Sequence, residues 1–405
     1  MEDPSVQVQA PRVLNVLEAL KQASVDLQAH PSSNSAEFNS SAIKALLELE
    51  TESDALLSED PHLSTLSQHL ADLKTLVQTL HKSRGRNSLR SFLARRVSTH
   101  SISRVAGSIE TEIQAWIDRE HIERLTKALK DLDGGGGNED ELVKLLTRFE
   151  GRVSQGFSRE LQDLVLKSKV FSLLETILCN PSCSKSLREQ SAYSIASLIR
   201  FNKDVFVGQV LMGPTVQALL TMSSTHSIKV LCELIKSIKS PLVDEIESNG
   251  EIPKIISLVD MKDLQMKLLA MDCILEIGYF GRKEAIDAML EQGLVKKLVE
   301  LQRSELGGDL IEMERFEEKE KNDRGVGAGG VVESKRESRE RKFLKRHPFA
   351  SCVARFAVQL EVGEGLRQRE RRALKQEILL RVREASASDA EAATIVAEVL
   401  WGSSP

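Results

Sequence analysis

Three patterns in the sequence combine residue types that could bind a nucleotide, a metal ion or a phosphate. Residues 325–330 read GVGAGG, but charged segments flank this stretch where a dinucleotide-binding loop needs a strand and a helix. Cys179 and Cys183 stand four residues apart without the second ligand pair of a zinc site. The four glycines at 134–137 lack the Gly-Lys-Ser/Thr continuation of a phosphate loop. The sequence therefore predicts no cofactor and no metal ion.

The side chains that commonly perform catalysis show no motif spacing. The eight histidines are scattered, and neither H-E-x-x-H nor G-x-S-x-G occurs. Carboxylates are frequent, but they fall on the charged faces of expected helices, and no acid–base pair stands apart from them. The pattern favours a protein that is not an enzyme.

A basic segment without acidic residues covers residues 81–104. If it is helical, Leu89, Phe92, Leu93 and Val97 form a small apolar face. In a chain of net charge −5 such a segment can dock on an anionic membrane or an acidic partner, or it can continue a bundle with its arginines in water. Its cations are Lys82, Arg84, Arg86, Arg90, Arg95, Arg96 and Arg104.

Ser98 follows two of these arginines in the sequence Arg95-Arg96-Val97-Ser98, which suits a basophilic kinase. A phosphate on Ser98 would add about two negative charges and would weaken a contact with lipid or with an acidic partner. We therefore predict Ser98 as a phosphorylation site.

The composition indicates helices that pack on helices. Of 405 residues, 41% are hydrophobic and only 4% are aromatic, so Leu, Ile, Val and Ala must form the core. No sustained alternation of apolar and polar residues predicts strands. The net charge of −5 makes the whole molecule a poor binder of nucleic acid. The fold class predicted from these features is all-α.

The first residues and the cysteines suggest a location. The chain begins with acidic and polar residues, and no stretch approaches about 18 consecutive apolar residues. Its five cysteines are sparse and mostly fall in apolar helical patterns, as expected in a reducing compartment. We expect the protein in the cytoplasm or the nucleus, or at the inner face of the plasma membrane if the basic segment binds lipid.

Two domains are predicted on either side of a glycine-rich hinge at 131–141. Amphipathic patterns at 11–27, 42–57, 63–80 and 101–132 predict an N-terminal four-helix bundle within residues 1–130. The four glycines of the hinge leave the backbone free to bend.

From residue 142 to residue 303 the sequence repeats. Gly213, Gly250 and Gly293 lie 37 and 43 residues apart. Each is followed by a short apolar helix, a longer helix and a third amphipathic piece. We expect each glycine to adopt a left-handed or tightly turned backbone at a helix end. A charged insertion at 304–346 is predicted to be a disordered loop, and residues 347–405 a last repeat with a C-terminal cap. Ser388 and Glu391 in that cap have capping-box spacing.

The three pieces per unit resemble the armadillo repeat family, over residues 158–303 and again over 347–384. With the stretch ETEIQAWIDREHIERL at 110–125, the whole chain resembles plant U-box armadillo proteins. The CPI-type motif and the TG-x-T-Y segment of a U-box are missing between the two predicted domains, so the resemblance does not imply ubiquitin-ligase activity.

This resemblance implies a short armadillo solenoid whose third helices line a groove for an extended peptide. It places Tyr193 where the family's nuclear-import receptors carry tryptophan, and Ser197 where they carry asparagine. The corresponding pairs in the later units are Glu233 with Ser237, Asp272 with Glu276, and Ser351 with Arg355. The asparagine is missing each time, which argues against an import receptor. The acidic residues favour a basic peptide partner, and the alternative is that they are ordinary surface charge.

The function predicted from the sequence is that of a non-catalytic scaffold or adaptor for protein partners in plant signalling. One alternative is a signalling component that the basic segment recruits to a membrane surface. Another is an accessory subunit of a ubiquitin-ligase pathway without ligase activity of its own.

Overall fold

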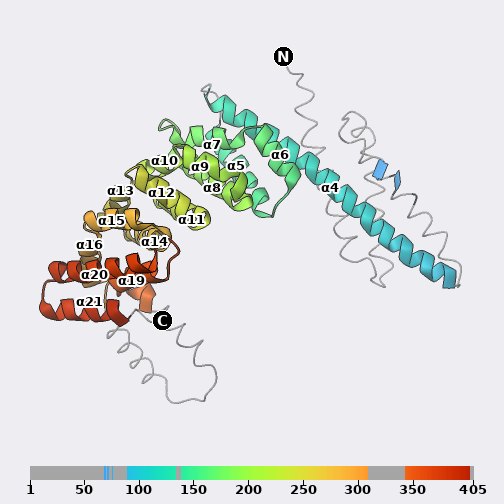
Figure 1. Ribbon diagram of the computed structural model, residues 1–405. Helices are drawn as coiled ribbons and strands as arrows, with labels where there is room; N and C mark the ends of the chain where they lie inside the picture. The colour runs from blue at the N-terminus through green and yellow to red at the C-terminus, as the bar shows by residue number, and fades with distance from the viewer. Residues whose placement is uncertain are drawn as a thin grey trace. The chain divides into compact units, whose positions relative to one another are not determined.

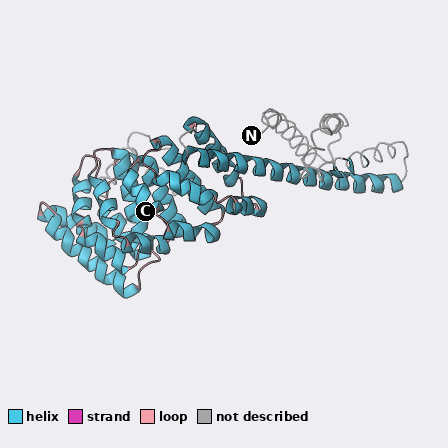
Figure 2. Cartoon of the chain, turned by 90° about the horizontal axis from the view of Figure 1, so that it is seen from above, coloured by secondary structure: helices cyan, strands magenta, loops and turns pink. Residues whose placement is uncertain are grey.

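The computed structural model describes residues 89–133, 138–308 and 343–401, and five single positions between 68 and 75 (Figure 1). Within these residues the regular structure is helical and no strand occurs (Figure 2), which confirms the all-α prediction. Most of the predicted four-helix bundle, the glycines of the hinge and most of the charged insertion lie outside the described residues.

The chain divides into two compact units, which we describe separately. The first unit contains residues 1–136 and 158–170, and the second contains residues 137–157 and 171–405. The predicted domain boundaries at residues 130, 141, 303 and 346 stay predictions.

In the first unit one long helix is the main described element. Helix α4 (Leu89–Asp133) has 45 residues, which corresponds to about 67 Å of helix, and α6 (Arg159–Lys167) packs against it. The buried apolar side chains of α4 recur at helical spacing because every third or fourth residue returns to the same face. They are Ile109, Ile113, Ile117, Ile122, Leu125 and Leu129.

The second unit consists of three-helix repeats stacked in chain order (Figure 1). The first three helices of this unit are α5 (Glu139–Ser154), α7 (Val170–Cys179) and α8 (Lys185–Phe201). The next repeat contains α9 (Lys203–Met212), α10 (Thr215–Met222) and α11 (Thr225–Ile238). It is followed by α12 (Ser240–Ser248), α13 (Ile252–Ser257) with the 3₁₀ turn η2 (Leu258–Asp260), and α14 (Leu264–Phe280). The last repeat contains α15 (Lys283–Glu291), α16 (Leu294–Arg303) and α19 (Cys352–Val362).

The third helix of each repeat packs on the third helix of the next. The third helices α8, α11, α14 and α19 contact one another in that order, and α5 packs on α8 at the start of the series. We call this series the third-helix row. Such stacking lets each repeat bury an apolar face that it could not cover alone, as in armadillo-type α-solenoids. The predicted solenoid fold is therefore confirmed for the second unit.

The junction glycines have two different physical roles. Gly250 and Gly293 have φ values of +67° and +74°, so the predicted left-handed backbone is confirmed at these two positions. Lys169 takes the same conformation, with φ +53°, at the end of the first short helix. At Gly213 the left-handed alternative is wrong: this glycine is extended at φ −101°, in the two-residue turn between α9 and α10. A Cβ atom there would lie 2.3 Å from Oε1 of Glu175, so this glycine is needed for space.

The segment between α19 and α20 (Gln368–Ala385) crosses the end of α14. The backbone N–H groups of Glu364 and Gly365 donate to the carbonyl of Tyr279 at 2.8 and 3.2 Å. The Arg371 guanidinium donates to the carbonyls of residues 361, 363 and 366, at 2.7, 2.6 and 3.1 Å. The Arg371 side chain therefore holds the shape of this turn, and the two backbone hydrogen bonds join the turn to the preceding repeat.

A buried carboxylate holds the C-terminal helix α21 (Asp389–Trp401) in place. Glu398 is only 4% exposed and accepts hydrogen bonds from Gln302 at 2.8 Å and from Ser351 at 2.9 Å. At the start of α21, the Ser388 hydroxyl accepts from the Glu391 N–H at 3.2 Å. The Glu391 carboxylate accepts from the Ala387 N–H rather than that of Ser388, so only half of the predicted capping box forms.

Candidate functional site

The structure places every predicted groove residue on the third-helix row or at its edge. Tyr193 and Ser197 lie on α8, Glu233 and Ser237 on α11, Asp272 and Glu276 on α14, and Arg355 on α19. Ser351, at the N-cap of α19, is buried and bound to Glu398, so it faces the interior and not a partner.

Ser197 is also buried, at 1% exposure, and its neighbour on the surface is Arg200. The guanidinium of Arg200 donates to the Ser197 hydroxyl at 2.9 Å and to the Glu233 carboxylate at 2.6 Å. Ser197 therefore orients a cation, whereas the resemblance had implied that this position would hold a peptide backbone.

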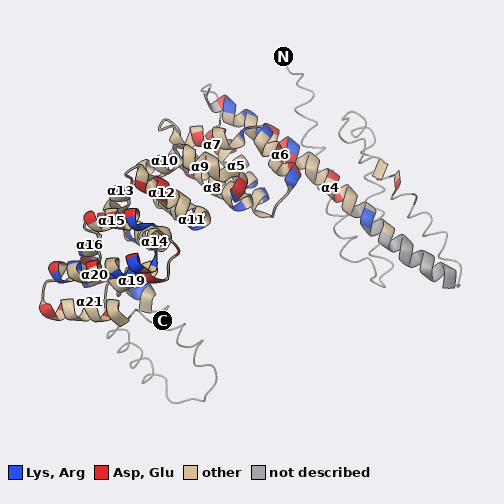
Figure 3. Cartoon of the chain, viewed as in Figure 1, with Lys and Arg blue, Asp and Glu red and all other residues tan. Residues whose placement is uncertain are grey.

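Cations from one repeat pair with carboxylates further along the chain. Arg200 on α8 pairs with Glu233 on α11, and Lys236 on α11 lies 3.5 Å from Glu276 on α14. Lys239 pairs with Glu364 at 3.2 Å across 125 residues of sequence. Both signs of charge occur on these helices (Figure 3). The acidic row predicted from the sequence is thus largely charge-balanced by cations that periodicity alone did not reveal.

Asp272 is the groove carboxylate without a direct ion pair among the described contacts. Desolvation by its neighbours raises the pKa of its carboxyl, and the positive charges of Lys236 and Arg355 offset this only in part. Arg355 itself donates to the carbonyl of Pro348 at 2.7 Å, which fixes its guanidinium near the start of α19.

Aromatic and acidic side chains surround Tyr193 on α8, and we call this part of the row the Tyr193 corner. The ring of His226 meets the Tyr193 ring edge-on at 6.0 Å, and the ammonium of Lys229 lies 5.9 Å from the ring centroid. Desolvation raises the pKa of the Tyr193 hydroxyl, and the carboxylates of Glu233, Glu189 and Glu150 raise it further. These three acidic residues come from α11, α8 and α5, which are successive members of the third-helix row.

Glu189 contributes an acceptor that lacks a donor in this corner. Its Oε2 lies 3.4 Å from Nδ1 of His226, whereas its buried Oε1 has no hydrogen-bond partner. The nearest cation, the Lys185 ammonium, is 4.0 Å away and belongs to a side chain that is 67% exposed. The buried Oε1 is not accessible to a partner, but the negative charge of the Glu189 carboxylate can attract a positively charged group at this corner.

The cysteines of the repeats lie mainly in the core. Cys232 on α11 and Cys273 on α14 interact through their thiols, which lowers the pKa of Cys232 and raises that of Cys273. Cys352 is buried, and burial raises its pKa to about 12. Cys179 and Cys183 are half-buried. No group of three or more His, Cys, Asp or Glu side chains with the geometry of a metal site occurs among the residues described.

The basic segment is helical from Leu89 onward, because α4 begins there. Arg104 is exposed on this helix. Arg90, Arg95, Arg96 and Ser98 belong to α4, but their side chains are not described. Lys82, Arg84 and Arg86 lie outside the described residues, as does the stretch GVGAGG.

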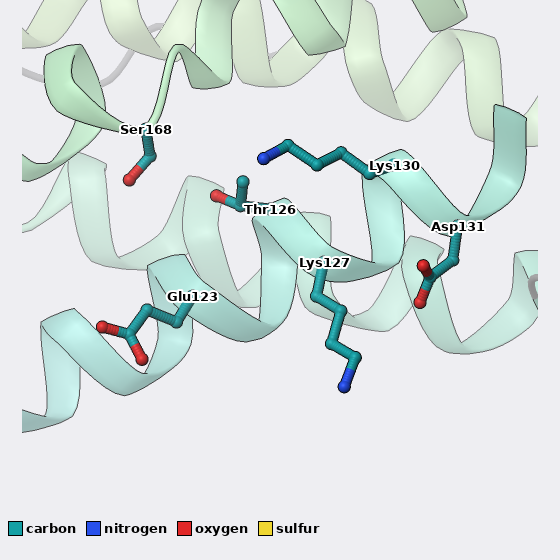
Figure 4. Close-up of a pocket in the computed structure, with 6 residues that line it drawn as sticks. All are labelled: Glu123, Thr126, Lys127, Lys130, Asp131 and Ser168. Carbon is teal, nitrogen blue, oxygen red and sulfur yellow. The ribbon is translucent and has the colours of Figure 1, made fainter. Parts of the chain in front are cut away.

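A surface depression of about 310 Å³ lies in the first unit, between α4 and the end of α6. In Figure 4 the Lys130 side chain extends toward Thr126 and Ser168, whereas Lys127 points away from them. Glu123 and Asp131 complete the lining, which therefore contains two cations and two anions. This balance gives the depression no preference for an anion or a cation.

No single helix in the described ranges is long and apolar enough to cross a membrane. Helices α9 and α10 meet that requirement only together, and they are bent by 68° at their junction.

The solved structures that are similar to this chain include designed and engineered proteins. No protein-family model matches the chain, and no curated protein matches it. A designed armadillo repeat protein is 15% identical, with a TM-score of 0.39 over 68% of this chain and 98% of its own. A second designed armadillo repeat protein, solved with the peptide (KR)4, is 17% identical, with a TM-score of 0.38 over 68% and 98%. An engineered protein is 14% identical, with a TM-score of 0.41 over 69% and 99%.

The class that the fold defines is an armadillo-like helical repeat protein. This assignment rests on the three-helix repeats and the third-helix row of the chain itself.

Proposed function

We propose that this chain is a non-catalytic scaffold that holds an extended segment of a protein partner along the third-helix row. The observation that carries the proposal is the uninterrupted contact of α8, α11, α14 and α19. Their surface positions hold polar groups that an extended backbone and its side chains can contact, including Tyr193, Glu233, Asp272 and Glu276. A row of this kind repeats similar groups at each unit, as an extended ligand requires.

The partner chemistry that fits best is a segment with lysine or arginine side chains. The Tyr193 corner offers an aromatic face and the three carboxylates of Glu150, Glu189 and Glu233. Arg200 and Lys229 now occupy part of this corner, and both are exposed, so an incoming cation can replace them. Charge at such a surface acts mainly on selectivity and on the rate of association.

The experiment uses the full chain and a fluorescent peptide of alternating lysine and arginine in an anisotropy titration. Changing Glu233, Asp272 and Glu276 to Gln, Asn and Gln should raise the dissociation constant of the peptide by about 10-fold or more. This change corresponds to a loss of about 1.4 kcal/mol or more of binding free energy. The matched control neutralises Glu247, Glu284 and Glu291 on α12 and α15 and should leave the affinity unchanged.

A second arm tests the competition inside the corner. Arg200→Ala removes the cation that pairs with Glu233 and should strengthen binding of the same peptide by about three-fold or more. Equal affinities for the wild type, the triple variant and Arg200→Ala would remove the proposal of a basic partner.

The resemblance of residues 110–125 to plant U-box armadillo proteins extends the proposal to a scaffold in plant signalling, in the cytoplasm or the nucleus. The same resemblance supports an accessory role in a ubiquitin-ligase pathway. Immunoprecipitation from plant tissue tests both, and a partner set without signalling or ligase components would oppose them.

A second candidate function is recruitment to an anionic membrane through the basic segment, and the exposed Arg104 on α4 favours it. Co-sedimentation with phosphatidylserine vesicles should then fall when Arg90, Arg95, Arg96 and Arg104 are changed to Glu. Ser98→Asp should also reduce this co-sedimentation if phosphorylation regulates the contact.

A further inference from the structure

The C-terminal cap presents an apolar surface that no described residue covers. At the end of α21, Leu400 is 53% exposed and Trp401 is 82% exposed. Together with Val396, Ala393 and Arg383 they line an open cavity of about 550 Å³. The outer face of the last repeat in a solenoid is usually polar, because nothing stacks on it. The exposed indole and the cavity therefore indicate a contact surface at this end of the second unit.

The two ends of this surface differ in size. Small side chains line its beginning, at Ala387, Ala392 and Ala393, whereas Leu400 and Trp401 lie at its end. A second α21 placed antiparallel on the first would set the large end of each helix over the small end of the other. Small residues at a contact allow two helices to approach closely. The same face thus carries both the protruding group and the space that accepts it.

The charge at the small end fits the same occupant. The small end carries one cation and one carboxylate, Arg383 and Asp389, and both line the cavity. Arg383 is exposed and has no ion pair or hydrogen bond to the described residues. In the antiparallel arrangement its guanidinium would face the Trp401 indole and the C-terminal carbonyls of the other α21. An aromatic face and a helix C-terminus both attract a cation. A two-fold contact between identical chains requires a self-complementary surface, and here the cation of each copy would meet the aromatic ring of the other.

We propose that this cap surface binds a second copy of the chain, with α21 antiparallel to α21 and each Trp401 seated at the small end of the other copy. The dimer leaves the third-helix row out of the contact, since the row uses helices α5, α8, α11, α14 and α19.

Sedimentation equilibrium of the full chain tests this proposal. The wild type should form a dimer, and Trp401→Ala should raise the dissociation constant by about 30-fold or more, as expected for truncating an aromatic anchor. Arg383→Glu should also raise the dissociation constant of the dimer. Two matched controls should leave it unchanged: Met212→Ala, which removes a side chain 92% exposed on α9, and Arg372→Glu on the exposed face of α20.

A mixing experiment separates a two-fold contact from any other association. In a mixture of Trp401→Ala and Arg383→Glu chains, a mixed dimer keeps one intact Arg383–Trp401 contact, whereas each homodimer keeps none. The mixture should therefore contain more dimer than either variant alone at the same total concentration. Circular dichroism confirms that both variants fold, and Trp401→Phe provides a milder change that should retain most of the dimer.

A wild type that remains monomeric up to about 1 mM would overturn the proposal, since that limit corresponds to a contact of only about 4 kcal/mol. A dimer that is insensitive to both cap variants would overturn it as well, because another surface would then join the chains. Binding of the monomeric wild type to neutral lipid vesicles or to an unrelated protein, lost in Trp401→Ala, would assign the cap to a different occupant.

Discussion

At the scale of single residues, polar side chains on the third-helix row already have partners in other repeats. Arg200 joins Glu233, Lys236 joins Glu276, and Lys239 joins Glu364. Each pair is partly exposed, so each contributes little to stability in water. Their larger effect is to place a cation beside each of these carboxylates. A partner with basic side chains must therefore exchange with resident cations, which makes selectivity depend on pairs that join different repeats.

A titratable pair near the C-terminus makes stability depend on pH. Arg303 donates to both oxygens of Glu391 at 2.8 and 2.9 Å, and this contact holds the pKa of the Glu391 carboxyl below its ordinary value. Because the pKa is lowered in the folded state, the ionised pair stabilises the fold above the unfolded-state pKa of about 4.3. That contribution is lost as the pH falls through the lowered pKa.

Thermal unfolding of Glu391→Gln tests this linkage. Near neutral pH the variant should be less stable by about 0.5–1 kcal/mol, because solvent screens the partly exposed Arg303. The gap to the wild type should close as the pH falls below the folded-state pKa. Glu384→Gln, at an exposed position on α20, should show no such convergence, and a gap for Glu391→Gln that persists in acid would contradict the assignment.

At the scale of helices, apolar periodicity and glycine positions predicted the elements closely. The short helix, the longer helix and the third amphipathic piece expected after Gly250 form α13 (Ile252–Ser257), α14 (Leu264–Phe280) and α15 (Lys283–Glu291). These boundaries are local, because caps and left-handed glycines depend on near neighbours. The role of Gly213 was not predictable, since its neighbour Glu175 lies 38 residues earlier in the chain and meets it only after the repeats stack.

Two glycine substitutions on neighbouring turns should have opposite effects on stability. Gly208 lies exposed inside α9 with open space around it, so Gly208→Ala should stabilise the protein by about 0.5–1 kcal/mol. Gly213→Ala should destabilise it by about 1–3 kcal/mol, because the new Cβ meets Glu175 and the carbonyl of Gln209. Thermal unfolding of both variants measures these changes in stability. Equal changes in melting temperature for the two variants would show that space at Gly213 is not limiting.

At the scale of the whole molecule, the sequence predicts the class of fold but not the surface that the fold presents. Repeat length and the glycines at 213, 250 and 293 suffice to expect a solenoid. The site is less predictable, because cross-repeat pairs depend on the register of stacking. Lys239 and Glu364 are separated by a long insertion, and no local pattern connects them. The Tyr193 corner likewise combines Glu150, Glu189 and Glu233 from three helices, so only the assembled row reveals it.

The central claim is that an extended peptide binds along the third-helix row, and photo-crosslinking tests it most directly. A lysine–arginine peptide carrying benzophenone at successive positions is irradiated with the full chain, and mass spectrometry locates the crosslinks. The account predicts crosslinks on α8, α11, α14 and α19, advancing from one helix to the next as the benzophenone moves along the peptide. Crosslinks concentrated on α9, α12 and α15, or absent altogether, would contradict it.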